Sequence, residues 1–277
     1  MEVRYSPDQT GFARMSTNEL RKSFLIDQLF VKNKIPMIYS EIDRSITGSA
    51  VPVGKKLELK ATKKEMAANY FAERREVGVI NIGGNGTIQI DKKNYSLKNR
   101  DAIYIGRGTK KIVFESKNAK APAQFYFVSY PAHAEYPTVK VTRKNTSSVN
   151  LGSLKNSNDR IIYKYIHPGN VQTCQLVMGL TELNEGSVWN TMPAHTHQRR
   201  SEVYMYFDLS KEDVLVHLIG APSETRHIIM RDRQAVLSPS WSLHSAAGTK
   251  NYSFIWAMGG ENQVFDDMDF IPMDSLL

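Results

Sequence analysis

Alternation of apolar and polar side chains runs through most of the chain and predicts short β-strands. The clearest example lies in residues 77–90, where VGVINI and TIQI are separated by Gly83-Gly84-Asn85-Gly86. The same pattern recurs in APAQFYFVSYPA, RIIYKYI, VQTCQLVMGLTEL, SEVYMYFDL, VLVHLIG, TRHIIM, QAVLSPSW and NYSFIWAMGG. Many short strands with few helical patterns predict an all-β fold built from sandwiches or barrels.

One early segment has helical periodicity instead. In STNELRKSFLIDQLF, either Ser16 or Thr17 can cap the start of a helix. Apolar residues then follow at helical spacing, namely Leu20, Phe24, Leu25 and Leu29. The sequence therefore predicts one short N-terminal helix in an otherwise β chain.

The segment YPTVKVTRKNTSSVNLGSLKNSNDR is polar and rich in Ser, Asn and Lys, and it is the best candidate linker, near residues 138–158. We expect two domains, residues 1–140 and 141–277, each of the size of a small β-sandwich. Both halves contain strand pairs punctuated by glycine, which suggests a distant internal duplication.

Composition and charge limit the cellular compartment and the classes of binding partner that we expect. The 277 residues include one cysteine and no apolar run of about 18 residues, and the N-terminus lacks the apolar core of a signal peptide. We therefore expect a cytoplasmic protein with no membrane partner. Residues 1–150 carry 26 Lys+Arg against 14 Asp+Glu, and residues 151–277 carry 10 against 14. Because the lysines occur as isolated pairs without a recognition-helix pattern, a solvated basic surface is favoured over nucleic-acid binding.

The segment MPAHTHQRRSEVYMYFDL carries the strongest chemical signal. His195 and His197 are two residues apart, so a strand would place both imidazoles on one face. Glu202 follows five residues later, and His244 comes after a proline-marked turn. Two histidines at this spacing alone are more often surface or packing residues. The added glutamate and third histidine favour a divalent transition-metal site with open coordination positions.

Strand parity predicts which neighbours face the metal. Arg200, Glu202 and Tyr204 share one face, so Arg200 is a candidate clamp for a substrate carboxylate. The alternative for Arg200 is a solvated arginine at a strand end. Further candidates for substrate binding are Arg160 at the rim, Thr191 on the face of His195, Thr181, and Met258 in the pocket wall.

The first half has no histidine before His133, so it cannot build a three-histidine site from its own strands. We expect this half to have a structural role or to form subunit contacts. The run Arg74-Arg75-Glu76 is read as a surface ion-pair cluster rather than a site. Cys174 is expected to be a buried, inert thiol, and the histidines outside the metal set (133, 167, 217, 227) to be packed or surface residues.

These motifs resemble known families. Gly186, His195, His197, Glu202 and His244 resemble the two motifs of the cupin superfamily, although the gap after Gly186 is longer than usual. The resemblance implies two cupin-like jelly-roll barrels, a bicupin, with the metal bound in the C-terminal one.

A narrower resemblance covers nearly the whole chain. RYSPDQTGFARMSTNELRKSFLIDQLF, FAERREVGVINIGGNGTI, FYFVSYPAHAEYPT and PSWSLHSAAGTKNYSFIWAMGGEN, together with the histidine segment, look like the 5-keto-4-deoxyuronate isomerase family. The resemblance implies a ketol-isomerase that converts 4-deoxy-L-threo-5-hexosulose uronate to 3-deoxy-D-glycero-2,5-hexodiulosonate in pectin degradation. It also implies one Zn²⁺ per subunit and a homohexamer.

The catalytic base is left open by the sequence. An enediol route needs a group that moves a proton between neighbouring carbons. Glu202, Tyr204 and a water on the ion are the candidates. Two other functions use the same ligands: an iron-dependent cupin dioxygenase and a sugar-binding cupin without catalysis.

Overall fold

The chain divides into two compact units in a computed structural model that describes all 277 residues. Unit 1 comprises Met1–Arg4, Gln28–Thr146 and Tyr165–Val177. Unit 2 comprises Tyr5–Asp27, Ser147–Lys164 and Met178–Leu277. The units are thus interleaved along the sequence, whereas the expected division was a single boundary after residue 140.

Unit 1 contains two β-sheets. The seven-stranded sheet has the order β1 (Glu2–Arg4), β3 (Met37–Ser40), β4 (Ile46–Ala50), β11 (Phe125–Pro131), β6 (Arg75–Asn81), β9 (Ala102–Ile105), β12 (Val139–Val141). The four-stranded sheet has the order β5 (Leu57–Glu58), β10 (Ile112–Ser116), β7 (Gly86–Ile90), β8 (Lys93–Leu97). Side chains from both sheets, including Val79 and Phe114, form one buried core. The one-turn helices η1 (Ile42–Arg44) and α3 (Lys63–Met66) lie in connecting loops.

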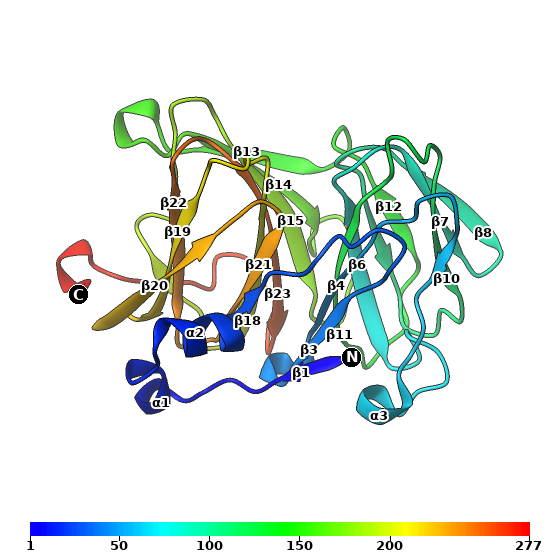
Figure 1. Cartoon of the computed structure of the whole chain (residues 1–277), viewed down its shortest axis with the longest axis horizontal. Coiled ribbons are helices and arrows are strands. Elements are labelled where there is room, and N and C mark those ends of the chain that lie inside the picture. The colour runs from blue at the N-terminus through cyan, green and yellow to red at the C-terminus, as the bar shows by residue number, and fades with distance from the viewer. The chain divides into compact units, whose positions relative to one another are not determined.

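Unit 2 repeats this plan (Figure 1). Its seven-stranded sheet has the order β13 (Ser147–Leu151), β14 (Arg160–Ile166), β15 (Val177–Leu183), β23 (Ser253–Gly260), β18 (Arg200–Phe207), β21 (Gln234–Ser238), β2 (Leu25–Ile26). Its four-stranded sheet has the order β16 (Trp189–Asn190), β22 (Leu243–Gly248), β19 (Leu215–Ala221), β20 (Glu224–Met230). A two-stranded sheet joins β17 (His195–Thr196) to β24 (Asp269–Phe270). The short helices η2 (Leu154–Asn156) and η3 (Met273–Ser275) complete the unit.

The fold is therefore all-β, as the alternation predicted, with the same pairing of a seven-stranded and a four-stranded sheet in each unit. The candidate linker near residues 138–158 is not a plain connection. It contains β12, β13 and η2. Polar composition did not prevent strand formation there, because the backbone of β13 pairs with β14 while its side chains stay exposed.

The predicted N-terminal helix corresponds to α2 (Thr17–Phe24), and a further short helix, α1 (Gln9–Ala13), precedes it. The two helices lie against β20 and β19 of unit 2, respectively (Figure 1). Ser16 is the N-cap of α2 and forms a capping box with Glu19. The predicted helix was too long. It ends at Phe24 because Leu25 and Ile26 pair with β21 as strand β2.

Arg75 and Glu76 do not form the expected surface ion pair. Both are buried, and strand alternation along β6 points them to opposite faces. The Glu76 carboxylate accepts hydrogen bonds from the backbone N–H groups of residues 174–176 at 2.7–2.9 Å and from the Tyr104 hydroxyl at 2.8 Å. Cys174 lies in this loop, partly exposed, rather than buried in a strand.

No helix of the structure has the length and apolar character needed to cross a membrane.

Candidate metal centre

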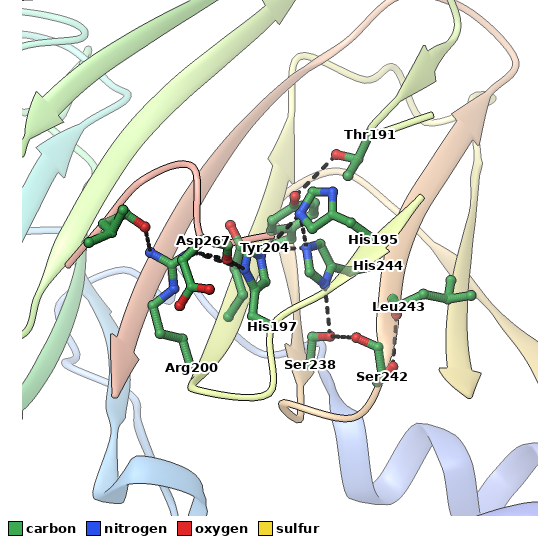
Figure 2. Close-up of polar contacts among 12 residues, drawn as sticks. Thr191, His195, His197, Arg200, Tyr204, Ser238, Ser242, Leu243, His244 and Asp267 are labelled. Atoms are coloured by element: carbon green, nitrogen blue, oxygen red, sulfur yellow. Dashed lines mark hydrogen bonds and ion pairs between the residues drawn. The ribbon is translucent and has the colours of Figure 1, made fainter. Parts of the chain in front are cut away.

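The four predicted ligands come together in unit 2, although they arise from three different sheets. His195 lies in β17, and His197 follows that strand directly. Glu202 lies in β18 of the seven-stranded sheet, and His244 lies in β22 of the four-stranded sheet. Figure 2 shows the imidazoles of His195, His197 and His244 gathered in one group.

Their donor atoms are spaced as ligands of one ion. His195 Nε2 lies 3.1 Å from His197 Nε2 and 3.2 Å from His244 Nε2. Glu202 Oε2 lies 2.8 Å from His244 Nε2 and 3.2 Å from His197 Nε2. Neighbouring donors about 2.0–2.1 Å from a common ion are separated by roughly 3.0–3.4 Å. The four residues therefore fit a single divalent transition metal, and all four are buried.

Electrostatics hold the donors in the forms that bind a metal. Burial lowers the pKa of His195 to about 2, with further contributions from His244 and His197, so this imidazole is neutral. Burial alone would raise the pKa of the Glu202 carboxyl. Hydrogen bonds and electrostatic interactions with His244 and His197 outweigh burial, so the pKa of Glu202 falls below its usual range. A neutral imidazole and an ionised carboxylate are the ligand forms that metal binding requires.

Groups behind the histidines fix the orientation of two rings. His197 Nδ1 lies 2.9 Å from the backbone oxygen of Asp267, and His244 Nδ1 lies 3.4 Å from Ser238 Oγ. With Nε2 facing the ion, Nδ1 of His197 carries the proton and donates it to Asp267. Such partners keep the ligand nitrogen aimed at the metal.

Arg200 lies elsewhere than strand parity predicted. Its guanidinium donates to the backbone oxygens of Val264 at 2.6 Å and Asp267 at 2.8 Å, and it does not line the cavity beside the ligands. In Figure 2 it lies on the opposite side of His197 from His195 and His244. Arg200 is the first residue of β18, and the C-terminal segment supplies the carbonyl groups that hold its guanidinium away from the cavity. Its Nη2 also lies 3.0 Å from His197 Nδ1, where two N–H groups cannot bond each other.

A cavity of about 290 Å³ opens next to the four ligands. Its wall is mainly apolar, with Trp256, Met258 and Phe254 from β23 among its members. Gly179 makes this wall possible, because a Cβ there would lie 2.2 Å from the Trp256 ring. An apolar cavity with a few convergent polar groups is typical of a small-molecule site.

The other candidate residues all line this cavity: Arg160, Thr181, Thr191, Tyr204 and Met258. Thr191 Oγ1 and the Tyr204 hydroxyl are 3.1 Å apart (Figure 2), and Thr181 Oγ1 accepts a hydrogen bond from Trp256 Nε1 at 3.1 Å. Burial raises the pKa of Tyr204 well above its usual value, and the negative charge of Glu202 adds to this. Arg160 is the only arginine or lysine that lines the cavity, and its Nη1 donates a hydrogen bond to the backbone oxygen of Asn158 at 2.8 Å.

Sequence reasoning missed the C-terminal segment of the site. Phe265, Asp266, Met268 and Phe270 line the cavity, and β24 pairs with the strand that carries His195. The segment has no motif of its own. The only signal was its aromatic and methionine content after the last long strand, which does not distinguish a cavity wall from a surface tail.

Comparison with known proteins shows the family of the chain. The KduI/IolB family model matches residues 25–273. The chain is 56% identical over 276 residues to the 4-deoxy-L-threo-5-hexosulose-uronate ketol-isomerase of Lachnoclostridium phytofermentans, with 100% of both chains covered.

Two solved structures show the same fold at low identity. An IolB-like protein from Salmonella typhimurium has a TM-score of 0.71 at 12% identity, covering 90% of this chain and 96% of that one. Oxalate decarboxylase from Bacillus subtilis has a TM-score of 0.57 at 8% identity, covering 79% and 70%. These structures support the cupin-like fold that the sequence motifs implied. The family model and the relative with 56% identity confirm the narrower resemblance. The chain belongs to the KduI/IolB family.

Proposed function

We propose that this protein is a ketol-isomerase, an intramolecular oxidoreductase that converts 4-deoxy-L-threo-5-hexosulose uronate to 3-deoxy-D-glycero-2,5-hexodiulosonate in pectin-derived uronate breakdown. The observation that carries the proposal is the buried group of three histidines and Glu202 at the end of a cavity that also presents one arginine. The printed name of the relative with 56% identity supports the same reaction.

The metal would be held by His195, His197, Glu202 and His244, one ion per chain. When bound, it would supply Lewis acidity toward adjacent carbonyl and hydroxyl oxygens of the substrate. We propose zinc, because imidazole and carboxylate ligands suit it and because it has no redox chemistry that would divert an enediol.

Arg160 is the proposed partner of the substrate carboxylate. Only its Nη1 makes a hydrogen bond within the protein, so its other N–H groups are available to the cavity. Burial lowers the pKa of this guanidinium, with Tyr204 and Tyr252 opposing the shift. A partly desolvated arginine gains more from an anionic ligand than one in water does.

Glu202 and Tyr204 are the proposed proton carriers. Glu202 Oε2 faces the histidines, while Oε1 makes no hydrogen bond within the protein and can take the C2 proton and return it at C1. The hydroxyl proton must move from O2 to O1 in the same conversion. Tyr204 stays protonated, and its hydroxyl both donates and accepts, so it is suited to this second transfer.

Assembly and location are proposed on narrower grounds. A homohexamer rests on the family resemblance alone, and light scattering during size-exclusion chromatography should then give six times the chain mass of 31.4 kDa. A cytoplasmic location is consistent with a single free cysteine.

The test is an NMR assay of purified protein with the hexosulose uronate, prepared by enzymatic cleavage of unsaturated digalacturonate. We expect loss of the aldehyde signal and growth of the ketone without oxygen uptake. Oxygen consumption by an iron-loaded sample would point to a dioxygenase. Binding of the uronate without turnover would point to a sugar-binding protein.

A further inference from the structure

A second cavity, of about 220 Å³, lies in unit 1, remote in sequence from the metal ligands. Three arginines line it: Arg44, Arg74 and Arg75. Its wall also contains Tyr39, Phe71 and one carboxylate, Glu65. Three arginines at one small cavity bring three positive charges together, so the groups that could neutralise these charges have to be identified.

Arg75 is a buried cation without an anionic partner. Its side chain is 7% exposed. Nε donates to Ser129 Oγ at 3.1 Å, and Nη2 donates to the backbone oxygens of Ser129 at 2.8 Å and Arg44 at 2.5 Å. All of these acceptors are neutral, and Nη1 makes no hydrogen bond. Burial lowers the pKa of this guanidinium to about 10, which reflects the cost of a charge that nothing neutralises.

Arg44 is held at the cavity by an unfavourable turn. Asp43 and Arg44 both have positive φ, 48° and 49°, in the tight connection between β3 and β4. Neither is glycine, so this conformation costs of the order of 1 kcal/mol or more for each residue. The turn directs the Arg44 carbonyl to Arg75, while the exposed Arg44 guanidinium makes no hydrogen bond or ion pair.

The other charged residues in the wall do not neutralise the positive charge of the cavity. Arg74 uses one nitrogen to bind the backbone oxygens of Met66 and Ala67, which are neutral. Glu65 is the only acidic residue in the wall, and the Met1 ammonium group lies 3.8 Å from its carboxylate. Three arginines therefore line a cavity whose single carboxylate already has a cationic neighbour.

We propose that this cavity binds a small oxyanion, a carboxylate or a phosphate, through Arg75, Arg44 and Arg74. Guanidinium groups match both anions with paired hydrogen bonds. A bound oxyanion would give Arg75 Nη1 an acceptor and would neutralise the buried charge. Free phosphate, a phosphate ester and a sugar acid share this chemistry, so the source of the anion is decided by experiment.

Isothermal titration with inorganic phosphate and, separately, with D-galacturonate tests the proposal at matched ionic strength. The full-length protein carries Arg160→Gln, so that carboxylate binding in the cavity beside the metal ligands is weakened. Arg75→Gln is the direct test, but it also disrupts hydrogen bonds within the folded protein, so its effects on folding and on anion binding are mixed. Arg44→Gln changes an exposed side chain with no partner and is the safer variant. Arg14→Gln, an exposed arginine in unit 2, is the matched control.

We expect at least one of the two anions to bind, and Arg44→Gln to weaken that binding by about 10-fold or more, as loss of a charge-assisted hydrogen bond implies. Arg14→Gln should leave it unchanged. Tighter binding of phosphate identifies a phosphate or phosphate ester, and tighter binding of galacturonate identifies a sugar acid. Absence of binding by both anions, or equal affinities in the Arg44→Gln and Arg14→Gln proteins, would overturn the proposal.

Discussion

Two arginines that open strands, Arg160 of β14 and Arg200 of β18, lie in different surroundings despite similar sequence positions. Because Arg200 lies two residues before Glu202, strand alternation predicted that its side chain would face the cavity. Strand β18 does begin at Arg200. The C-terminal segment then supplies the carbonyl groups that capture its guanidinium. That segment lies more than 60 residues away, so no local pattern around Arg200 could reveal it. Arg160 faces the cavity instead.

The Arg160→Gln variant should therefore show the loss of carboxylate binding. A charge-assisted hydrogen bond contributes about 1.5–3 kcal/mol, so we expect KM to rise roughly 10- to 150-fold. Metal content should stay unchanged, because Arg160 touches none of the four ligands. Steady-state kinetics with metal analysis measures both, and Arg231→Gln on the exposed surface is the control. An unchanged KM would remove Arg160 from substrate binding.

Arg200→Met should affect the metal rather than the substrate. Arg200 holds the Asp267 carbonyl that orients His197, and loss of such support typically costs about 10- to 100-fold in metal affinity. Arg199→Met is the comparison, because Arg199 forms solvent-screened ion pairs with the side chains of Asp267 and Asp269 and does not bind the Asp267 carbonyl. Competition with a chelator measures both affinities. Equal losses in the two variants would contradict the positioning role of Arg200.

His217 gives a pH-dependent prediction. It is buried in β19 with Nδ1 2.7 Å from the Tyr206 hydroxyl, and burial lowers its pKa to about 3. The unfolded chain, with an ordinary histidine pKa near 6.5, binds this proton between pH 6.5 and 3 while the native state does not. Stability is therefore lost as the pH falls below about 6.5, by about 1.4 kcal/mol per pH unit.

In urea unfolding across this pH range, the free energy of unfolding should fall less steeply with decreasing pH for His217→Gln than for the wild type. Glutamine can still accept from Tyr206 but does not titrate. The other titrating groups are common to both proteins, so the difference between the two curves isolates His217. Parallel curves would mean that His217 does not remain neutral in the folded state.

At the level of elements, the strands that could be predicted are those whose own side chains alternate. β6, β11, β18 and β23 are examples. The start of α2 was predictable because Ser16 and Glu19 form a local capping box. Its end was not, because Leu25 and Ile26 suit a helix as well as a strand, and pairing with β21 decides between them. β13 was missed because its stability comes from backbone pairing.

The loop before β15 depends on one buried carboxylate, which gives an element-scale prediction. In Glu76→Gln, one accepting oxygen becomes an NH₂ group that faces existing donors. Two charge-assisted hydrogen bonds at about 1.5–3 kcal/mol each are lost, so we expect a destabilisation of about 3–6 kcal/mol. The midpoint of urea unfolding measures it. Glu115→Gln, which breaks an exposed ion pair with Lys56, should cost about 0–1 kcal/mol, and a similar shift in both variants would refute this role of Glu76.

For the whole molecule, the sequence predicted two β-sandwiches but not how the chain is shared between them. Residues Tyr5–Asp27 contribute α1, α2 and β2 to unit 2, and Tyr165–Val177 belongs to unit 1. These assignments depend on contacts between segments far apart in the chain, such as Arg21 with Ile229 and Glu76 with Leu176. The ligand set was predictable because His195, His197, Glu202 and His244 keep a recognisable spacing, even though three sheets supply them.

The central claim is that these four residues hold one metal ion on which isomerisation depends. Titration of the chelator-treated protein with Zn²⁺, with isomerisation followed by NMR at each addition, tests this claim most directly. We predict that the rate rises linearly from near zero and reaches a plateau at one ion per chain. Activity that is independent of added metal, or a plateau at a clearly different ratio, would contradict the account.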